Sequence, residues 1–93
     1  MTDRKMKKLK SILDYYGKEN QIAKTFEEMA ELQQLLARSI TKPGTVAKVS
    51  IASEIADVEI MLNQMKIAFD CEKDVEVWNE IKIRRQMERM AKE

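Results

Sequence analysis

Two short stretches of the chain place acidic residues at a spacing that suits metal-ion chemistry. Glu28 and Glu31 are three residues apart in "FEEMAELQQLL", and Glu54 and Asp57 are three residues apart in "SEIADVEIMLNQM". On a helix, residues at positions i and i+3 lie on the same side, a few ångströms apart. Two antiparallel helices that face each other would therefore join the two pairs into one cluster of carboxylates.

The helical positions of these acids put them against apolar side chains. On a helical wheel, Glu28 falls between Leu32 and Leu35, while Glu54 projects between Met61 and Met65. An ionised carboxylate in such a setting costs several kcal/mol unless it is protonated, paired with a basic residue or bound to a metal. The two helices offer no basic residue on these faces, and protonation of all four acids would need large pKa shifts. A divalent cation solves the problem most directly.

The chain has no histidine, and neither acidic stretch contains cysteine, so the carboxylates are the only side-chain ligands these stretches offer. Ligation by carboxylate oxygen atoms alone favours a hard ion, Mg²⁺ or, as a substitute, Mn²⁺, over zinc. The alternative interpretation is a solvated surface, since each acidic pair taken alone is common on exposed helix faces. Only the joint occurrence of both displaced pairs favours a metal site, so the residues by themselves leave both interpretations open.

The elements that must position these acids are helices. Apolar residues recur at steps of three and four, and no sustained alternation indicates a strand. Gly17 is predicted to end the first helix, and Asn20 to cap the second. Residues 1–93 are therefore predicted to form a single all-α domain, a four-helix antiparallel bundle-like fold. Its helices are expected at about 4–16, 20–40, 46–69 and 71–90.

The core of this bundle is expected to be small. The second helix carries one apolar arc, and three aromatic rings have spacings typical of core residues. The arc comprises Phe26, Met29, Leu32, Leu36 and Ile40, and the three rings are Tyr16, Phe26 and Trp78. A domain of this size buries only about 60–65 % of the surface of its unfolded chain. We therefore expect the fold to be completed by self-association into a homodimer or tetramer.

Composition excludes several other classes of function. The chain has 17 basic and 16 acidic residues, so no global field attracts nucleic acid, and the basic start "RKMKKLK" has no interleaved aromatics. The absence of histidine excludes His-based zinc sites and triads. Cys71 is the only cysteine, which excludes an intrachain disulfide and favours a cytoplasmic location. No segment approaches the ~20 apolar residues of a membrane span.

The two acidic motifs resemble a known family when they are taken together. Glu27-Glu28-Met29-Ala30-Glu31, followed after 22 residues by Glu54-Ile55-Ala56-Asp57, resembles the "EExxE … ExxD" signature of the MazG-like all-α nucleotide pyrophosphohydrolases. The flanking segments "ENQIAKTFEEMAEL" and "EIADVEIMLNQMKI" agree with that family. The tail "EIKIRRQMERM" is similar to the last helix of short, phage- or prophage-type members.

This resemblance, which covers about residues 18–90, implies an activity. Members of the family cleave a nucleoside triphosphate between its α and β phosphates with Mg²⁺, which gives a monophosphate and pyrophosphate. The implied metal ligands and catalytic carboxylates are Glu28, Glu31, Glu54 and Asp57. The implied substrate-binding residues are Asn79, Lys82 and Arg85 for the phosphates and Gln21 for a base edge. Lys24 and Arg38 are expected to be solvated. Glu27 matches the leading acid of the motif, for which the alternatives are contact with a second metal, orientation of a water, or simple solvation, and solvation is favoured.

A second interpretation of the whole chain is a non-catalytic, dimeric helical interaction module. The seven methionines and the narrow polar face of the third expected helix suit a helix–helix interface in either case. The two interpretations differ over the carboxylates, because only the hydrolase requires them to bind Mg²⁺.

Overall fold

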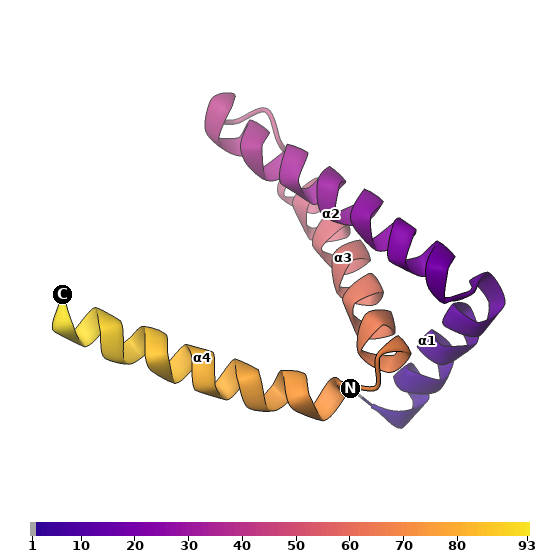
Figure 1. Cartoon of the computed structure of the whole chain (residues 1–93). Helices are drawn as coiled ribbons and strands as arrows, with labels where there is room; N and C mark the ends of the chain where they lie inside the picture. The colour runs from indigo at the N-terminus through magenta and orange to yellow at the C-terminus, as the bar shows by residue number, and fades with distance from the viewer. Residues whose placement is uncertain (1) are drawn as a thin grey trace.

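The computed structural model describes residues 2–93 and contains four helices (Figure 1). They are α1 (Asp3–Tyr16), α2 (Lys18–Thr41), α3 (Lys48–Ala68) and α4 (Glu72–Lys92). No strand occurs in the described part of the chain, so the predicted all-α fold is confirmed. Each helix end lies within two residues of its expected position.

Local chemistry explains the junction between the first two helices. Gly17 has φ = 90°, a conformation that glycine adopts at little cost, and its N–H donates to the Leu13 carbonyl at 2.8 Å. Gly17 therefore ends α1, as predicted. The prediction that Asn20 caps α2 is wrong, because α2 already begins at Lys18. The Asn20 side-chain amide instead donates to the Tyr16 carbonyl at 2.8 Å and closes the last turn of α1.

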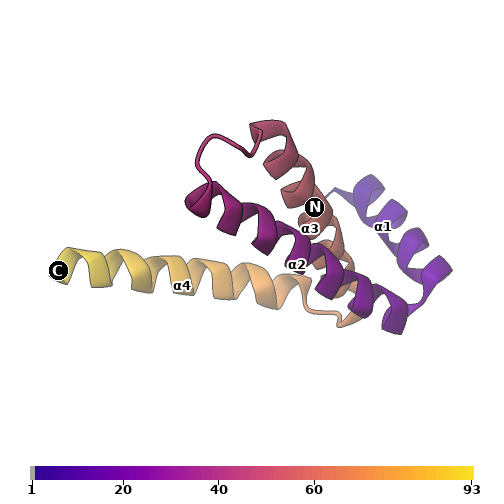
Figure 2. The same cartoon turned by 90° about the horizontal axis from the view of Figure 1, so that it is seen from above.

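The helices form an open arrangement around the α2–α3 hairpin (Figures 1 and 2). α1 packs against both α2 and α3, near the end of the hairpin where α2 begins. Among the described residues, the buried hydrophobic side chains are Leu9, Leu13, Val58 and Met61. None of the four helices is both long and apolar enough to cross a membrane.

α4 extends away from the other helices. Within the described chain it contacts α3 alone, and it buries no residue of its own (Figure 1). The radius of gyration is 16.1 Å, whereas a compact chain of this length has about 12 Å. The chain is therefore bundle-like in its first three helices and extended at its fourth.

The apolar arc of α2 is not in the core, which corrects the expectation from sequence. Phe26 is 67 % and Ile40 79 % exposed, while the buried residues of α2 are Gln21, Thr25 and Glu28. The physical reason is that α2 turns its polar stripe toward α3, while the adjacent apolar arc meets α3 only along one edge, at Val58. Tyr16 and Trp78 are also largely exposed, contrary to their predicted place in the core.

Candidate metal centre

Three of the four predicted ligands come together where α2 and α3 face each other. Glu28 of α2 and Glu54 and Asp57 of α3 each offer one carboxylate oxygen, and these atoms all lie within 4.8 Å of one another. Glu28 is 8 % exposed, and the other two acids are half-buried. The seam between the two helices therefore holds a compact group of three hard oxygen donors.

Glu31, the fourth predicted ligand, lies at the exposed edge of this group. It is not one of the three acids within 4.8 Å. Its carboxyl is nevertheless near Glu54, because it contributes to raising the pKa of that residue. Glu31 thus borders the cluster and faces solvent.

The cluster contains two carboxylate oxygen atoms that lack a hydrogen-bond donor. Glu28 Oε2 and Glu54 Oε1 are both buried and unpartnered in the described part of the chain. A buried acceptor without a partner costs about 1–3 kcal/mol, and more when it is charged. Such a cost is expected at a site where another group completes the arrangement.

The pKa values of Glu28 and Glu54 also reflect the close approach of their carboxyl groups. The pKa of Glu54 is raised to about 7. The main cause is the neighbouring Glu28 carboxyl, and burial is the second. The pKa of Glu28 is lowered, chiefly by the neighbouring Glu54 carboxyl, while burial opposes this shift and Lys24 adds to it. The two acids therefore oppose each other's ionisation, as expected for like charges at close range.

These residues fit a magnesium ion. Octahedral Mg²⁺ with oxygen ligands at ~2.1 Å needs neighbouring oxygen atoms about 3 Å apart and opposite ones about 4.2 Å apart. The three carboxylate oxygen atoms lie within 4.8 Å of one another, which is close to this range. Small side-chain rotations would therefore bring them to the distances that Mg²⁺ requires. The donor set contains only carboxylate oxygen, and two of its atoms lack any other partner.

Lys24 is a site residue that the sequence analysis assigned to solvent. Its Nζ lies 3.4 Å from Glu28 Oε1 and 3.4 Å from Glu27 Oε2. The side chain is half exposed, but its charge is paired with the cluster. The signal was present in the sequence, because Lys24 stands three and four residues before these two acids. Glu27 itself is mostly exposed, as expected.

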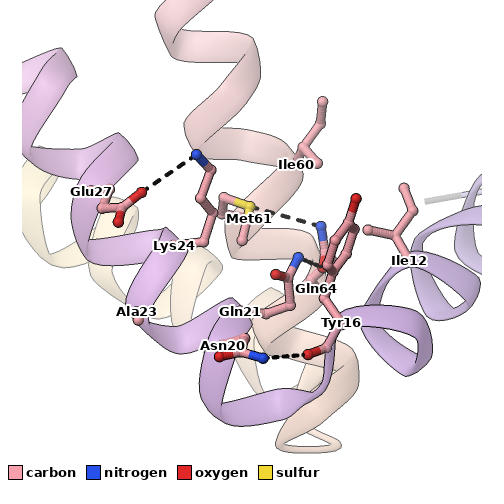
Figure 3. Close-up of a pocket in the computed structure, with 10 residues that line it drawn as sticks. All are labelled: Ile12, Tyr16, Asn20, Gln21, Ala23, Lys24, Glu27, Ile60, Met61 and Gln64. Carbon is pink, nitrogen blue, oxygen red and sulfur yellow. Dashed lines mark hydrogen bonds and ion pairs between the residues drawn. The ribbon is translucent and has the colours of Figure 1, made fainter.

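A cavity of about 590 Å³ lies between α1, α2 and α3 (Figure 3). Lys24 belongs both to its lining and to the edge of the acidic cluster, so the cavity and the cluster adjoin. The polar or aromatic side chains of the lining include Tyr16, Asn20, Gln21, Lys24, Glu27 and Gln64.

Gln21 is buried in this cavity wall and already has a partner. Its Nε2 donates to Gln64 Oε1 at 2.7 Å, and Gln64 Nε2 donates in turn to Met61 Sδ at 3.8 Å (Figure 3). Gln64 is 1 % exposed and was not identified from the sequence. The predicted contact of Gln21 with a base stays a prediction, and it would have to use the side-chain oxygen or the second N–H of the amide.

The predicted phosphate-binding residues of α4 stand apart from the acids within one chain. Asn79 lines a depression on α3 together with Glu59 and Lys66. Lys82 Nζ and Arg85 Cζ lie 5.8 Å and 5.9 Å from the centroid of the Trp78 ring. Because α4 contacts only α3 and then projects away, it does not complete the site of its own chain.

Comparisons with known proteins add no relative. No protein-family model matches this chain, and no curated protein or solved structure matches it either. The resemblance to the MazG-like pyrophosphohydrolases therefore stays a prediction that depends on the motif residues. The geometry of the acidic cluster supports the metal site independently of that resemblance.

Proposed function

We propose that this protein is a Mg²⁺-dependent nucleoside triphosphate pyrophosphohydrolase, which releases a nucleoside monophosphate and pyrophosphate. One observation carries the proposal: Glu28, Glu54 and Asp57 bring carboxylate oxygen atoms within 4.8 Å of one another, and two buried oxygen atoms of the cluster have no partner. A solvated acidic surface does not explain orphaned acceptors in a helix seam.

The chemistry of the substrate explains the need for a cation. A triphosphate carries several negative charges, which bare carboxylates would repel. Bound Mg²⁺ supplies positive charge toward phosphate oxygen atoms and lowers the pKa of a bound water. Glu31 borders the cluster and is open to solvent, so it is the acid best suited to accept a proton from the attacking water.

The neighbouring cavity suits the rest of the nucleotide. Its volume of about 590 Å³ falls within the ~300–1,000 Å³ of typical ligand sites. Tyr16 offers an aromatic face, and Asn20 and Gln21 offer amides for the edge of a base. Lys24 lies between this cavity and Glu28, where its ammonium can contact a phosphate.

The test is pyrophosphate release from a panel of canonical and deoxy triphosphates, with Mg²⁺ or Mn²⁺. We expect turnover by the natural protein and its loss in Glu54→Gln, which should keep its helical circular dichroism. The matched control is Glu59→Gln, an exposed acid on the same helix, which should keep its activity. Absence of cleavage for every triphosphate, together with no effect of Mg²⁺ on the melting temperature, would overturn the proposal.

The second candidate is a non-catalytic, dimeric helical interaction module. The observation that favours it is the set of large apolar side chains that α2 and α4 leave exposed, including Phe26, Ile40 and Trp78. Such surfaces mark interaction sites. A module of this kind would self-associate without any thermal stabilisation by Mg²⁺.

A further inference from the structure

The cavity beside the acidic cluster is walled by two side-chain amides that already bond to the protein. Asn20 and Gln21 are neighbours on α2, and both line this cavity of about 590 Å³ together with Tyr16 (Figure 3). A side-chain amide can present either its oxygen, which accepts, or its N–H groups, which donate. The bonds that each amide makes within the chain therefore decide which groups a ligand meets.

The Asn20 amide has its nitrogen turned toward the protein. Its Nδ2 donates to the Tyr16 carbonyl at 2.8 Å. A backbone carbonyl can only accept, so the reversed amide would set two oxygen atoms against each other. Within the described chain, no donor contacts the Asn20 side-chain oxygen. This oxygen is therefore left as an acceptor for a ligand.

The Gln21 amide is oriented by a chain of two hydrogen bonds. Its Nε2 donates to Gln64 Oε1 at 2.7 Å, and Gln64 Nε2 donates to Met61 Sδ at 3.8 Å (Figure 3). A thioether sulfur accepts weakly and has no hydrogen to donate, so it favours this direction for both bonds. Gln64 is 1 % exposed, so bulk water cannot satisfy a reversed amide.

This chain of bonds leaves Gln21 with two free groups, its side-chain oxygen and its second N–H. The buried, unpartnered oxygen atoms of the described residues belong to Glu28 and Glu54. The Gln21 oxygen is not one of them, so it is accessible from the cavity that this residue lines. A ligand in the cavity therefore meets two amide oxygen atoms and one N–H whose positions the protein has fixed.

These groups are complementary to one class of base. Cytosine and adenine each carry an exocyclic amine, which donates, beside a ring nitrogen that only accepts. The two amide oxygen atoms can accept from the amine, and the second N–H of Gln21 can donate to the ring nitrogen. Uracil and hypoxanthine instead have a carbonyl oxygen and a ring N–H at these positions. Against the fixed amides, they set acceptor against acceptor and donor against donor.

We propose that the cavity selects nucleotides whose base has an exocyclic amine next to an unprotonated ring nitrogen, and that Gln64 and Met61 are positioning residues for this choice. The inference rests on the proposed function, because it takes the cavity as the place of the base. Gln21 is only 6 % exposed, so a base without the amine leaves a nearly buried acceptor unpaired. A site of this kind rejects the unmatched base by about tenfold or more.

Two pairs of triphosphates test the selection, because the members of each pair differ only at these two positions. The pairs are CTP with UTP and ATP with inosine triphosphate. With Mg²⁺, kcat/KM for pyrophosphate release should favour CTP and ATP within their pairs by about tenfold or more. The ratio of CTP to ATP measures the preference for ring size separately. Equal values within both pairs would overturn the inference and leave the proposed function standing.

Substitutions behind Gln21 test the positioning role without changing the amide that meets the base. Met61→Leu keeps the side-chain volume but removes the sulfur acceptor, so neither direction of the Gln64 amide is favoured. Gln64→Leu frees the Gln21 amide altogether. Both variants should bring the CTP to UTP ratio toward one, chiefly through a higher kcat/KM for UTP. An unchanged ratio in both variants would contradict the positioning role, even if their activity or stability falls.

The matched control for the amide itself is a glutamine elsewhere on α2. Gln21→Leu removes the free acceptor and should abolish the preference for CTP over UTP. Gln34→Leu makes the same change at an exposed position that does not line the cavity, so the ratio should stay at its natural value. Equal loss of the preference in both variants would show that Gln21 has no special part in it.

Binding of nucleoside monophosphates separates this inference from the proposed function. In calorimetric titrations with Mg²⁺, CMP should bind the natural protein about tenfold or more tighter than UMP, and Gln21→Leu should lose the difference. A protein that binds CMP in preference to UMP but never cleaves a triphosphate would refute the hydrolase and leave the base selection standing. Equal affinities for CMP and UMP would overturn the base selection even where triphosphates are cleaved.

Discussion

The two sides of α2 differ in a way that inverts the usual relation between polarity and burial. The side toward α3 buries Gln21, Thr25 and Glu28, and the neighbouring apolar arc leaves Met29 and Ile40 exposed. Polar groups in an interior cost free energy unless they are paired, whereas apolar groups gain from burial. This arrangement of α2 is the one expected if the buried stripe has a role other than packing, as the proposed function requires.

The inner side is satisfied only in part. At one end, the polar side chains are paired. Gln21 Nε2 donates to Gln64 Oε1 at 2.7 Å, and the Thr25 hydroxyl donates to the Gln21 carbonyl at 2.7 Å. At the other end, Glu28 Oε2 and Glu54 Oε1 have no donor. The contrast separates a paired polar contact from the two unpaired carboxylate oxygen atoms on which the proposed metal site depends. Four experiments test these differences between the buried and exposed residues and between the paired and unpaired groups.

The largest expected effect is on stability and contrasts Met61 with Leu36. Met61→Ala removes a buried side chain, and we expect a loss of about 2–4 kcal/mol in the free energy of unfolding. Leu36→Ala should cost less than about 1 kcal/mol in dilute protein, since Leu36 is half exposed within one chain. Urea denaturation at two protein concentrations measures both. A cost of Leu36→Ala that does not grow with concentration would contradict the predicted self-association through this apolar arc.

The next effect concerns the buried amide pair. Gln64→Leu leaves the Gln21 amide without its acceptor, so we expect a loss of about 1–3 kcal/mol. The double change Gln21→Leu with Gln64→Leu replaces both polar partners and should recover most of that loss. Thermal and urea unfolding of the two variants would measure the difference. Equal destabilisation by the double variant would show that the pair does not act as a unit.

The third effect is a pH dependence of the metal-free protein and of Mg²⁺ binding. The pKa of Glu54 is raised to about 7 by Glu28, above its ordinary value of 4.5. The stability it contributes is therefore complete below pH 4.5 and is lost as the pH rises through 7. Mg²⁺ must displace this proton, so its apparent affinity should fall about tenfold per pH unit below pH 7.

Melting curves between pH 5.5 and 8.5, with and without Mg²⁺, measure this effect. The metal-free melting temperature should decline as the pH rises to about 7 and then level off, while the increase caused by Mg²⁺ should grow over the same interval. Glu54→Gln removes the titrating group and serves as the control, for which both trends should flatten. A Mg²⁺ effect that is independent of pH would separate the metal from Glu54.

The smallest expected effect comes from Lys24. Its ammonium lies 3.4 Å from Glu28 and competes electrostatically with a cation. At pH 8, Lys24→Met should therefore tighten Mg²⁺ binding about two- to fivefold, a size typical of an exposed pair. It should also raise the KM for a triphosphate, because a phosphate contact is lost. Lys10→Met removes a similar exposed ion pair with Asp14 on α1 and should change neither quantity.

Helical periodicity was sufficient to predict the four helices and the clustering of three of the four candidate acids. The end of α1 followed from a local signal, Gly17, that does not depend on the rest of the fold, whereas Asn20 did not cap α2 as predicted. Glu28, Glu54 and Asp57 came together because i and i+3 spacing fixes their side of each helix. Glu31 belongs to the same spacing but lies at the edge, where the rotation of α2 about its own axis decides exposure.

The orientation of α2 was not predictable from its own pattern. Periodicity identifies an apolar arc, but it does not say whether the arc packs within the chain or against another molecule. Phe26 and Trp78 were assigned to the core for this reason, and both are exposed. Gln64 was missed because a buried glutamine has no sequence signature, and its partner Gln21 is 43 positions away.

The division of the proposed site between helices has a consequence for how activity depends on abundance. The acids reside on α2 and α3 of one molecule, while the basic half of α4 projects away from them. If its turnover requires two molecules, dilution near the dissociation constant would lower the rate per molecule, although each would still load its ion. The cell could then tune hydrolysis through expression level alone, with no dedicated inhibitor.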